Sequence, residues 1–90
     1  MRNVRILHTQ ITDKIRVSSA AIWYPGLEYS PSPYYQYETW CFSDDGKQRS
    51  FQVIHGCHSK IHHKWIVDAI KIHKHIVRNL KKQGGNYDGN

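Results

Sequence analysis

The stretch from Tyr34 to Phe42 constrains the fold more than any other part of this sequence. It is rich in aromatic and β-favouring residues and runs into Ser43-Asp44-Asp45-Gly46, which is typical of a strand entering a hairpin turn. Alternation places apolar side chains on both faces of this strand: Trp40 and Phe42 on one, and Tyr35, Tyr37 and Cys41 on the other. A strand that is apolar on both sides is predicted to be central, covered, or part of an interface.

Three further strands are predicted around this one, at residues 4–11, 15–24 and 49–55. Polar or glycine-containing breaks separate them, and Gly56 is expected to end the last strand. Residues 25–34 form a loop that is rich in proline and tyrosine. This loop either folds back over the sheet or presents its tyrosines to a partner.

The hydrophobic period becomes helical after Ser59. Apolar residues recur on one half of the helical circumference: Ile61, Trp65, Ala69, Ile70, Ile72, Ile76, Val77 and Leu80, with His62 and His73 in the same arc. Ser59 is predicted to cap this helix and Gly84-Gly85 to end it. The sequence thus predicts one α+β domain over residues 1–85, an antiparallel four-stranded sheet with one long C-terminal amphipathic helix packed on one face, and a disordered tail at 86–90.

The positive charge is concentrated in one segment. Residues 60–82 contain seven basic residues and one acid, which accounts for the whole net charge of +6, because the rest of the chain has six of each. No apolar run approaches the roughly 18 residues that span a bilayer, so no membrane contact is expected. The basic N-terminus lacks the pattern of a signal peptide, and two cysteines do not make a disulfide framework. These features favour a reduced, cytoplasmic setting.

Three segments together resemble a group of small phage and prophage proteins of unassigned function. They are Val17-Ser18-Ser19-Ala20-Ala21-Ile22-Trp23, Tyr37-Glu38-Thr39-Trp40-Cys41-Phe42, and a helix in which His63 precedes Val67 by four residues. The family pattern is a V-S-T-like strand, a Y-E-T-M-V-F-like strand and a helix carrying G-H-x-x-M-V. Here Trp40-Cys41 stands where the pattern has Met-Val, and His62 stands where it has Gly. The resemblance implies a phage or mobile-element origin and expression in a bacterial host cytoplasm, but no chemistry.

A cluster of histidine and cysteine follows the fourth predicted strand. His55, Cys57 and His62 or His63 are predicted to come together where that strand meets the helix, with Cys41 available as a fourth ligand. Tetrahedral zinc sites use such ligands, although this spacing matches no established zinc module. The alternative is a histidine-rich turn without metal, with His62 partly buried against the apolar face of the helix. Zinc is therefore an alternative hypothesis, and no cofactor is the leading expectation.

The polar half of the helix is an alternative candidate site for nucleic acid. Its basic residues are Lys60, Lys64, Lys71, Lys74, Arg78, Lys81 and Lys82. Lysines in this number bind a phosphate backbone without reading its sequence, and nearby aromatic residues are able to stack on bases. A solvated helix surface is the ordinary explanation of such a row, but here almost no acids are mixed in.

Catalysis is not expected from this sequence. The acids are few, and Glu38 is the exception that lies inside an aromatic strand. Pairing with His55 or His63 would allow acid–base chemistry, but a structural role, at a strand edge or paired with Arg49 across the hairpin, is favoured. The sequence has no phosphate loop and no nucleophile elbow. A non-enzymatic protein is predicted.

The aromatic surplus between residues 23 and 40 suggests a protein interface, because one helix covers only one face of the sheet. The predicted protein-binding residues are Tyr29, Tyr34, Tyr35 and Tyr37. The leading hypothesis is a binding module that occludes a host or defence protein, with a homodimer as a further possibility. The alternative is that the long loop itself covers this face.

Overall fold

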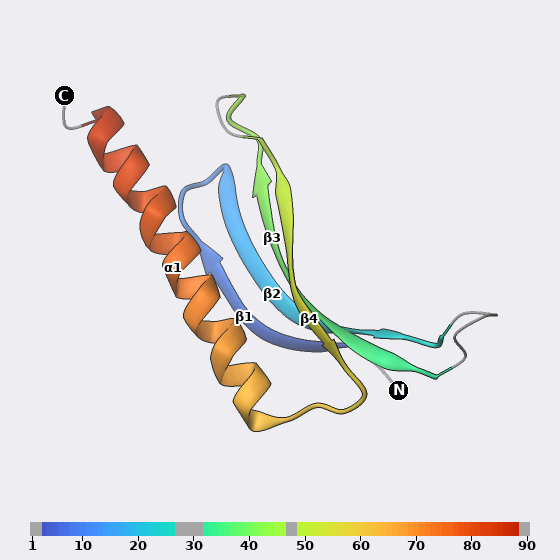
Figure 1. Ribbon diagram of the computed structural model, residues 1–90. Coiled ribbons are helices and arrows are strands. Elements are labelled where there is room, and N and C mark those ends of the chain that lie inside the picture. The colour runs from blue at the N-terminus through green and yellow to red at the C-terminus, as the bar shows by residue number, and fades with distance from the viewer. Residues whose placement is uncertain (1–2, 27–31, 47–48, 89–90) are drawn as a thin grey trace.

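The computed structural model describes residues 3–26, 32–46 and 49–88, with side chains described up to Lys82 in the last range. Its elements are β1 (Val4–Gln10), β2 (Ile15–Tyr24), β3 (Tyr34–Ser43), β4 (Phe51–His58) and α1 (His63–Asp88). The strands form one antiparallel sheet in the order β1-β2-β3-β4, and α1 lies diagonally across one face of it (Figure 1). The predicted α+β architecture is confirmed.

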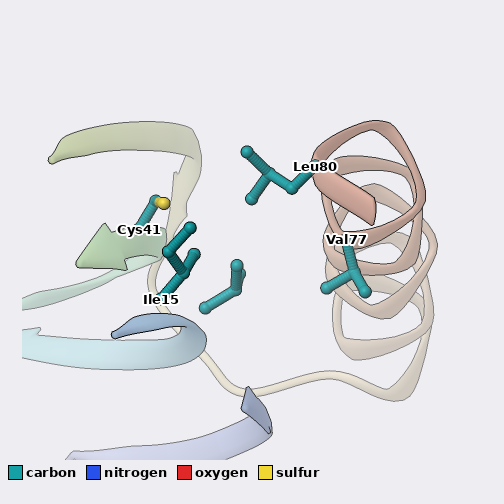
Figure 2. Close-up of a cluster of buried hydrophobic side chains, with 5 residues drawn as sticks. Ile15, Cys41, Val77 and Leu80 are labelled. Carbon is teal, nitrogen blue, oxygen red and sulfur yellow. The ribbon is translucent and has the colours of Figure 1, made fainter. Parts of the chain in front are cut away.

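The core lies between α1 and the two central strands. One cluster consists of Ile15, Val17, Cys41, Val77 and Leu80 (Figure 2), and a second consists of Ala21, Tyr35, Tyr37 and Ala69. Alternation explains why these residues share a face, since the β2–β3 register pairs Val17 with Cys41 and Ala21 with Tyr37. Burial of one large aliphatic side chain contributes about 1.5–3 kcal/mol, so these two clusters hold α1 on the sheet.

β4 continues beyond the predicted break at Gly56 and ends at His58. Gly56 pairs with Tyr37 and Ile54 pairs with Glu38, which leaves His55 as an extra residue in a β-bulge. Gly56 does not adopt a positive φ, and a Cβ placed there would meet His58 Nε2 at 3.5 Å, an ordinary contact. The glycine therefore does not interrupt the strand, and the prediction of its end was wrong by three residues.

The two ends of α1 also differ from the prediction. The helix begins at His63, and His62 caps it in place of Ser59: the backbone N–H of Lys64 donates to His62 Nδ1 at 3.2 Å. His62 is exposed, although its ring still contacts that of Trp65 on the apolar face, with centroids 5.4 Å apart. The helix continues through Gly84-Gly85 to Asp88, so residues 86–88 belong to α1 and residues 89–90 lie outside the described chain. Glycine costs a helix about 1 kcal/mol but causes no clash, which allows this continuation.

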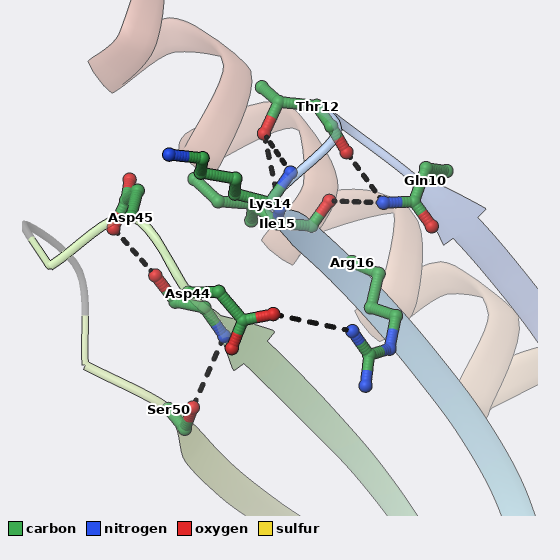
Figure 3. A network of polar contacts seen from close by, with 9 residues as sticks. Gln10, Thr12, Lys14, Ile15, Arg16, Asp44, Asp45 and Ser50 are labelled. Carbon is green, nitrogen blue, oxygen red and sulfur yellow. Dashed lines mark hydrogen bonds and ion pairs between the residues drawn. The ribbon is translucent and has the colours of Figure 1, made fainter.

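The turns are fixed by hydrogen bonds more than by ion pairs (Figure 3). Thr12 Oγ1 accepts from the backbone N–H groups of Lys14 and Ile15, both at 3.1 Å, and closes the β1–β2 turn. At the same end of the sheet, the N–H of Asp44 donates to the carbonyl oxygen of Lys14 at 2.9 Å. The Arg16–Asp44 ion pair, at 4.0 Å, is largely exposed and contributes about 0–1 kcal/mol.

The opposite ends of β2 and β3 project beyond the other strands as a two-stranded ribbon (Figure 1). Tyr24 and Tyr34 close this ribbon, with ring centroids 5.3 Å apart and planes within 17°. The predicted loop tyrosine, Tyr29, lies outside the described residues. Within the described chain, no helix is long and apolar enough to cross a membrane.

Candidate functional site

A buried carboxylate lies at the centre of the sheet face opposite α1. Glu38 on β3 is only 2% exposed, although no described element covers this face. Its Oε2 accepts hydrogen bonds from Tyr24 Oη at 2.8 Å and Gln36 Nε2 at 3.0 Å. Its Oε1 accepts from Trp40 Nε1 at 2.8 Å and Gln52 Nε2 at 2.6 Å. Each carboxylate oxygen thus has two donors, which matches its lone pairs.

Strand geometry brings these donors to Glu38. Gln36 and Trp40 are its neighbours at i−2 and i+2 on β3, and side chains two residues apart share a face. The β2 residue opposite Glu38 is Ala20, whose small side chain leaves space beside the carboxylate. All four donors are neutral, and among the described residues Glu38 has no contact with Arg49, His55 or His63. None of the charged pairings that the sequence left open is therefore present.

The carboxylate fixes the aromatic side chains around it. The hydrogen bond to Glu38 raises the pKa of Tyr24, so its hydroxyl group stays a donor. Trp40, held by its ring N–H, is still 38% exposed, and Ile54, the β4 partner of Glu38, is 56% exposed. We call this surface the open-face patch: Tyr24, Tyr34, Trp40, Phe42 and Ile54.

Aromatic contacts extend this ordered surface along β3. The rings of Trp40 and Phe42 meet edge to face with centroids 5.9 Å apart, and the guanidinium of Arg16 lies 4.6 Å from the Phe42 centroid. Rigid aromatic side chains lose little conformational entropy when a partner binds. The open-face patch is therefore an ordered surface suited to molecular recognition.

Two of the predicted protein-binding tyrosines lie on the other side of the sheet. Tyr35 and Tyr37 are 5% and 2% exposed and face α1, where Tyr37 packs edge-on to Trp65. Their assignment to an exposed surface is corrected, because α1 covers the face that they share with Cys41. Tyr34 does belong to the open-face patch and is half-buried. The signal that identifies the covered face is the register, which pairs Tyr37 with Ala21 on the same face as the Val17–Cys41 pair.

The predicted zinc ligands do not converge. His55 faces α1 and is hydrogen-bonded through Nε2 to Thr39 Oγ1 at 2.5 Å, whereas Cys57 faces the opposite side, where its thiol donates to Gln36 Oε1 at 3.5 Å. Residues two apart normally share a face, but the bulge at His55 reverses this. His62 is engaged as the helix cap. Among the described residues, no three His, Cys, Asp or Glu side chains are placed to hold a metal ion.

A second polar network crosses the core beneath α1. His73 is 0% exposed; its Nε2 is hydrogen-bonded to Thr9 Oγ1 at 2.9 Å and its Nδ1 to Ser19 Oγ at 2.7 Å. Ser19 Oγ continues to Thr39 Oγ1 at 2.5 Å, and Thr39 Oγ1 to His55. Every strand and the helix contribute one residue. We call this series the core relay.

Burial favours the neutral form of both histidines of the core relay. It lowers the pKa of His55, and it lowers the pKa of His73 together with the nearby His8 and His55. No carboxylate takes part in the relay to stabilise a positive charge. Within the described residues, no buried side-chain nitrogen or oxygen lacks a hydrogen-bond partner.

We expect the stability to fall as the pH drops below about 6.5, the value for an unperturbed histidine. The unfolded chain takes up protons at His55 and His73 before the folded chain does, so stability is complete above this pH and decreases toward the lowered folded pKa values. Urea unfolding between pH 7.5 and 5 measures the effect. In a His55→Leu/His73→Leu variant, the free energy of unfolding should decrease much less between pH 7.5 and 5 than it does in the wild type. An equal decrease would contradict the assignment of this pH dependence to the two histidines.

The predicted basic residues are all exposed. Lys60 precedes α1, and Lys64, Lys71, Lys74, Arg78 and Lys82 lie along it, with Asp68 as the one acid between His63 and Lys82. The row therefore presents a positive surface away from the open-face patch. No protein-family model matches the sequence, and neither curated proteins nor solved structures show significant similarity to it.

Proposed function

We propose that this protein is a non-enzymatic binding module that recognises another protein through the open-face patch. The observation that carries this proposal is the position of Glu38, a carboxylate buried on a sheet face that no described element covers and saturated by four donors. Burying a charge is costly, so a buried carboxylate at this position favours a role beyond packing. That role is to hold the side chains of Tyr24 and Trp40 in one arrangement before a partner arrives.

The composition of the patch also favours a protein partner. Aromatic residues dominate protein interfaces, and anchor residues carry most of the binding energy. The resemblance to small phage proteins adds the proposed context: occlusion of a host or defence protein in a bacterial cytoplasm. The alternative is that a second copy of the chain binds the same patch and forms a homodimer. Sedimentation of the isolated protein shows whether it is a monomer or a dimer.

We expect Ile54→Glu to weaken binding of a partner purified from host lysate by about tenfold or more, because it places a charge at the most exposed residue of the patch. Binding is measured by calorimetry with the purified partner. Ile72→Glu is the matched control: Ile72 is 37% exposed but lies on α1, outside the patch. Equal losses in the two variants would argue against the open-face patch as the interface.

Binding of nucleic acid by the basic row is a second candidate function. The exposed cations of α1, with Asp68 as the one acid among them up to Lys82, favour it. In that case the binding constant for an oligonucleotide should fall steeply with salt, in proportion to the number of phosphates contacted. A constant that is indifferent to salt would eliminate this candidate.

A further inference from the structure

A groove of about 420 Å³ lies between β1 and α1, away from the open-face patch. Its floor is formed by Leu7, Thr9 and Val77, and the buried ring of His73 closes it from behind. Its helix side carries three exposed cations: Lys74, Arg78 and Lys81. None of the described residues that line the groove is acidic. It therefore combines an apolar floor with an uncompensated positive rim.

The spacing of the three cations suits an extended chain. They are four and three residues apart on α1, so they span about 10 Å along the helix axis. Side chains on one face of a strand repeat about every 6.7 Å. Two or three acidic side chains on one face of a strand would therefore reach the rim together.

The neighbouring strand has a free side on which such a chain can pair. β1 is an edge strand, and in the described structure it pairs only with β2. The register is irregular at Ile6 but regular from Leu7 to Gln10, which borders the groove. The unpaired backbone groups of an edge strand are a template for β-strand addition.

We propose that this groove binds an extended acidic segment of a partner protein, which adds to β1 as a fifth strand and directs its carboxylates to Lys74, Arg78 and Lys81. Charge selects this occupant over a second copy of the chain, which would bring a net charge of +6 against a positive rim. Nucleic acid fits the groove less well, because its lining offers no exposed aromatic ring for stacking. The proposal shares no residue with the open-face patch.

The test uses the full chain and a capped eight-residue peptide of alternating valine and glutamate. Binding is measured by calorimetry, and hydrogen exchange of the backbone amides of residues 7–10 is followed by NMR. We expect the peptide to slow exchange in β1. A Lys74→Glu/Arg78→Glu/Lys81→Glu variant should bind it about tenfold more weakly or worse.

The matched control is Lys60→Glu/Lys64→Glu/Lys71→Glu, which makes the same change of net charge outside the groove. It should weaken binding by less than about threefold at physiological salt, where screening acts within about 8 Å. All six residues are exposed, so circular dichroism should show both variants folded. Equal losses in the two variants, equal binding of a valine–lysine peptide, or an oligonucleotide that displaces the acidic peptide would each overturn the proposal. So would the absence of binding.

Discussion

Replacing His73 with alanine is expected to lower the free energy of unfolding by about 3–5 kcal/mol. The change removes a fully buried ring, takes away the partner of Thr9 Oγ1, and leaves Ser19 Oγ with Thr39 as its remaining partner in the relay. A domain of this size has a total stability of roughly 5–13 kcal/mol, so a large part of it would be lost. Urea denaturation at pH 7.5 measures the difference.

His75→Ala is the matched control for this prediction. His75 lies on the same helix but is exposed, and its Nε2 contacts Asn79 Nδ2 at 3.2 Å. We expect a change of less than about 0.5 kcal/mol. A double-mutant cycle then tests the relay itself. Ser19→Ala should lower the free energy of unfolding less in a His73→Leu background than in the wild type, because both partners of that contact are then apolar. Additive effects would mean that the two residues are not coupled.

Replacing Glu38 with alanine is expected to lower the free energy of unfolding by about 2–4 kcal/mol, and to weaken partner binding by about tenfold or more. Four donors lose their acceptor, although water can reach some of them on the uncovered face. The loss of binding follows because Tyr24 and Trp40 are no longer held in one arrangement. Urea denaturation and calorimetry with the purified partner measure the two effects.

Glu38→Gln keeps the shape of the side chain but removes its charge. Its amide nitrogen is itself a donor, so two of the four donors lose their acceptor. It should also weaken binding, with a smaller loss of stability. Gln52→Ala removes a single donor and should cost only about 0.5–1.5 kcal/mol. Trp40 is one reporter of the patch, and its solvent exposure should rise in the Glu38 variants, as measured by fluorescence quenching. Retained binding together with unchanged quenching in Glu38→Ala would show that the carboxylate does not order the patch.

The fold could be predicted because its signals are local. Alternation along β2 and β3 and the helical period after Ser59 depend only on neighbouring residues, and both are confirmed. The bulge at His55 could not be predicted, since it is defined by pairing with β3. That single extra residue is the reason why His55 and Cys57, which alternation alone would place on one face, face opposite sides.

The candidate site was predictable only in part for the same reason. The sequence shows that Glu38 is out of place in an aromatic strand, but its donors Tyr24 and Gln52 come from the flanking strands. Trp40 and Tyr37 are equally aromatic, and only the side taken by α1 decides which of them is exposed. The core relay is less local still, because Thr9 and His73 are 64 residues apart.

The core relay has no built-in direction, because every hydroxyl and neutral imidazole in it both gives and receives one proton. If His55 carries its hydrogen on Nε2 and each hydroxyl donates within the relay, then Thr39 donates to Ser19, Ser19 to Nδ1 of His73, and His73 to Thr9. If His55 carries it on Nδ1, all of these bonds reverse together. The two imidazoles on opposite sides of the core therefore share one tautomeric state, and a hydrogen bond made to either ring from outside would set the hydrogen position on the other.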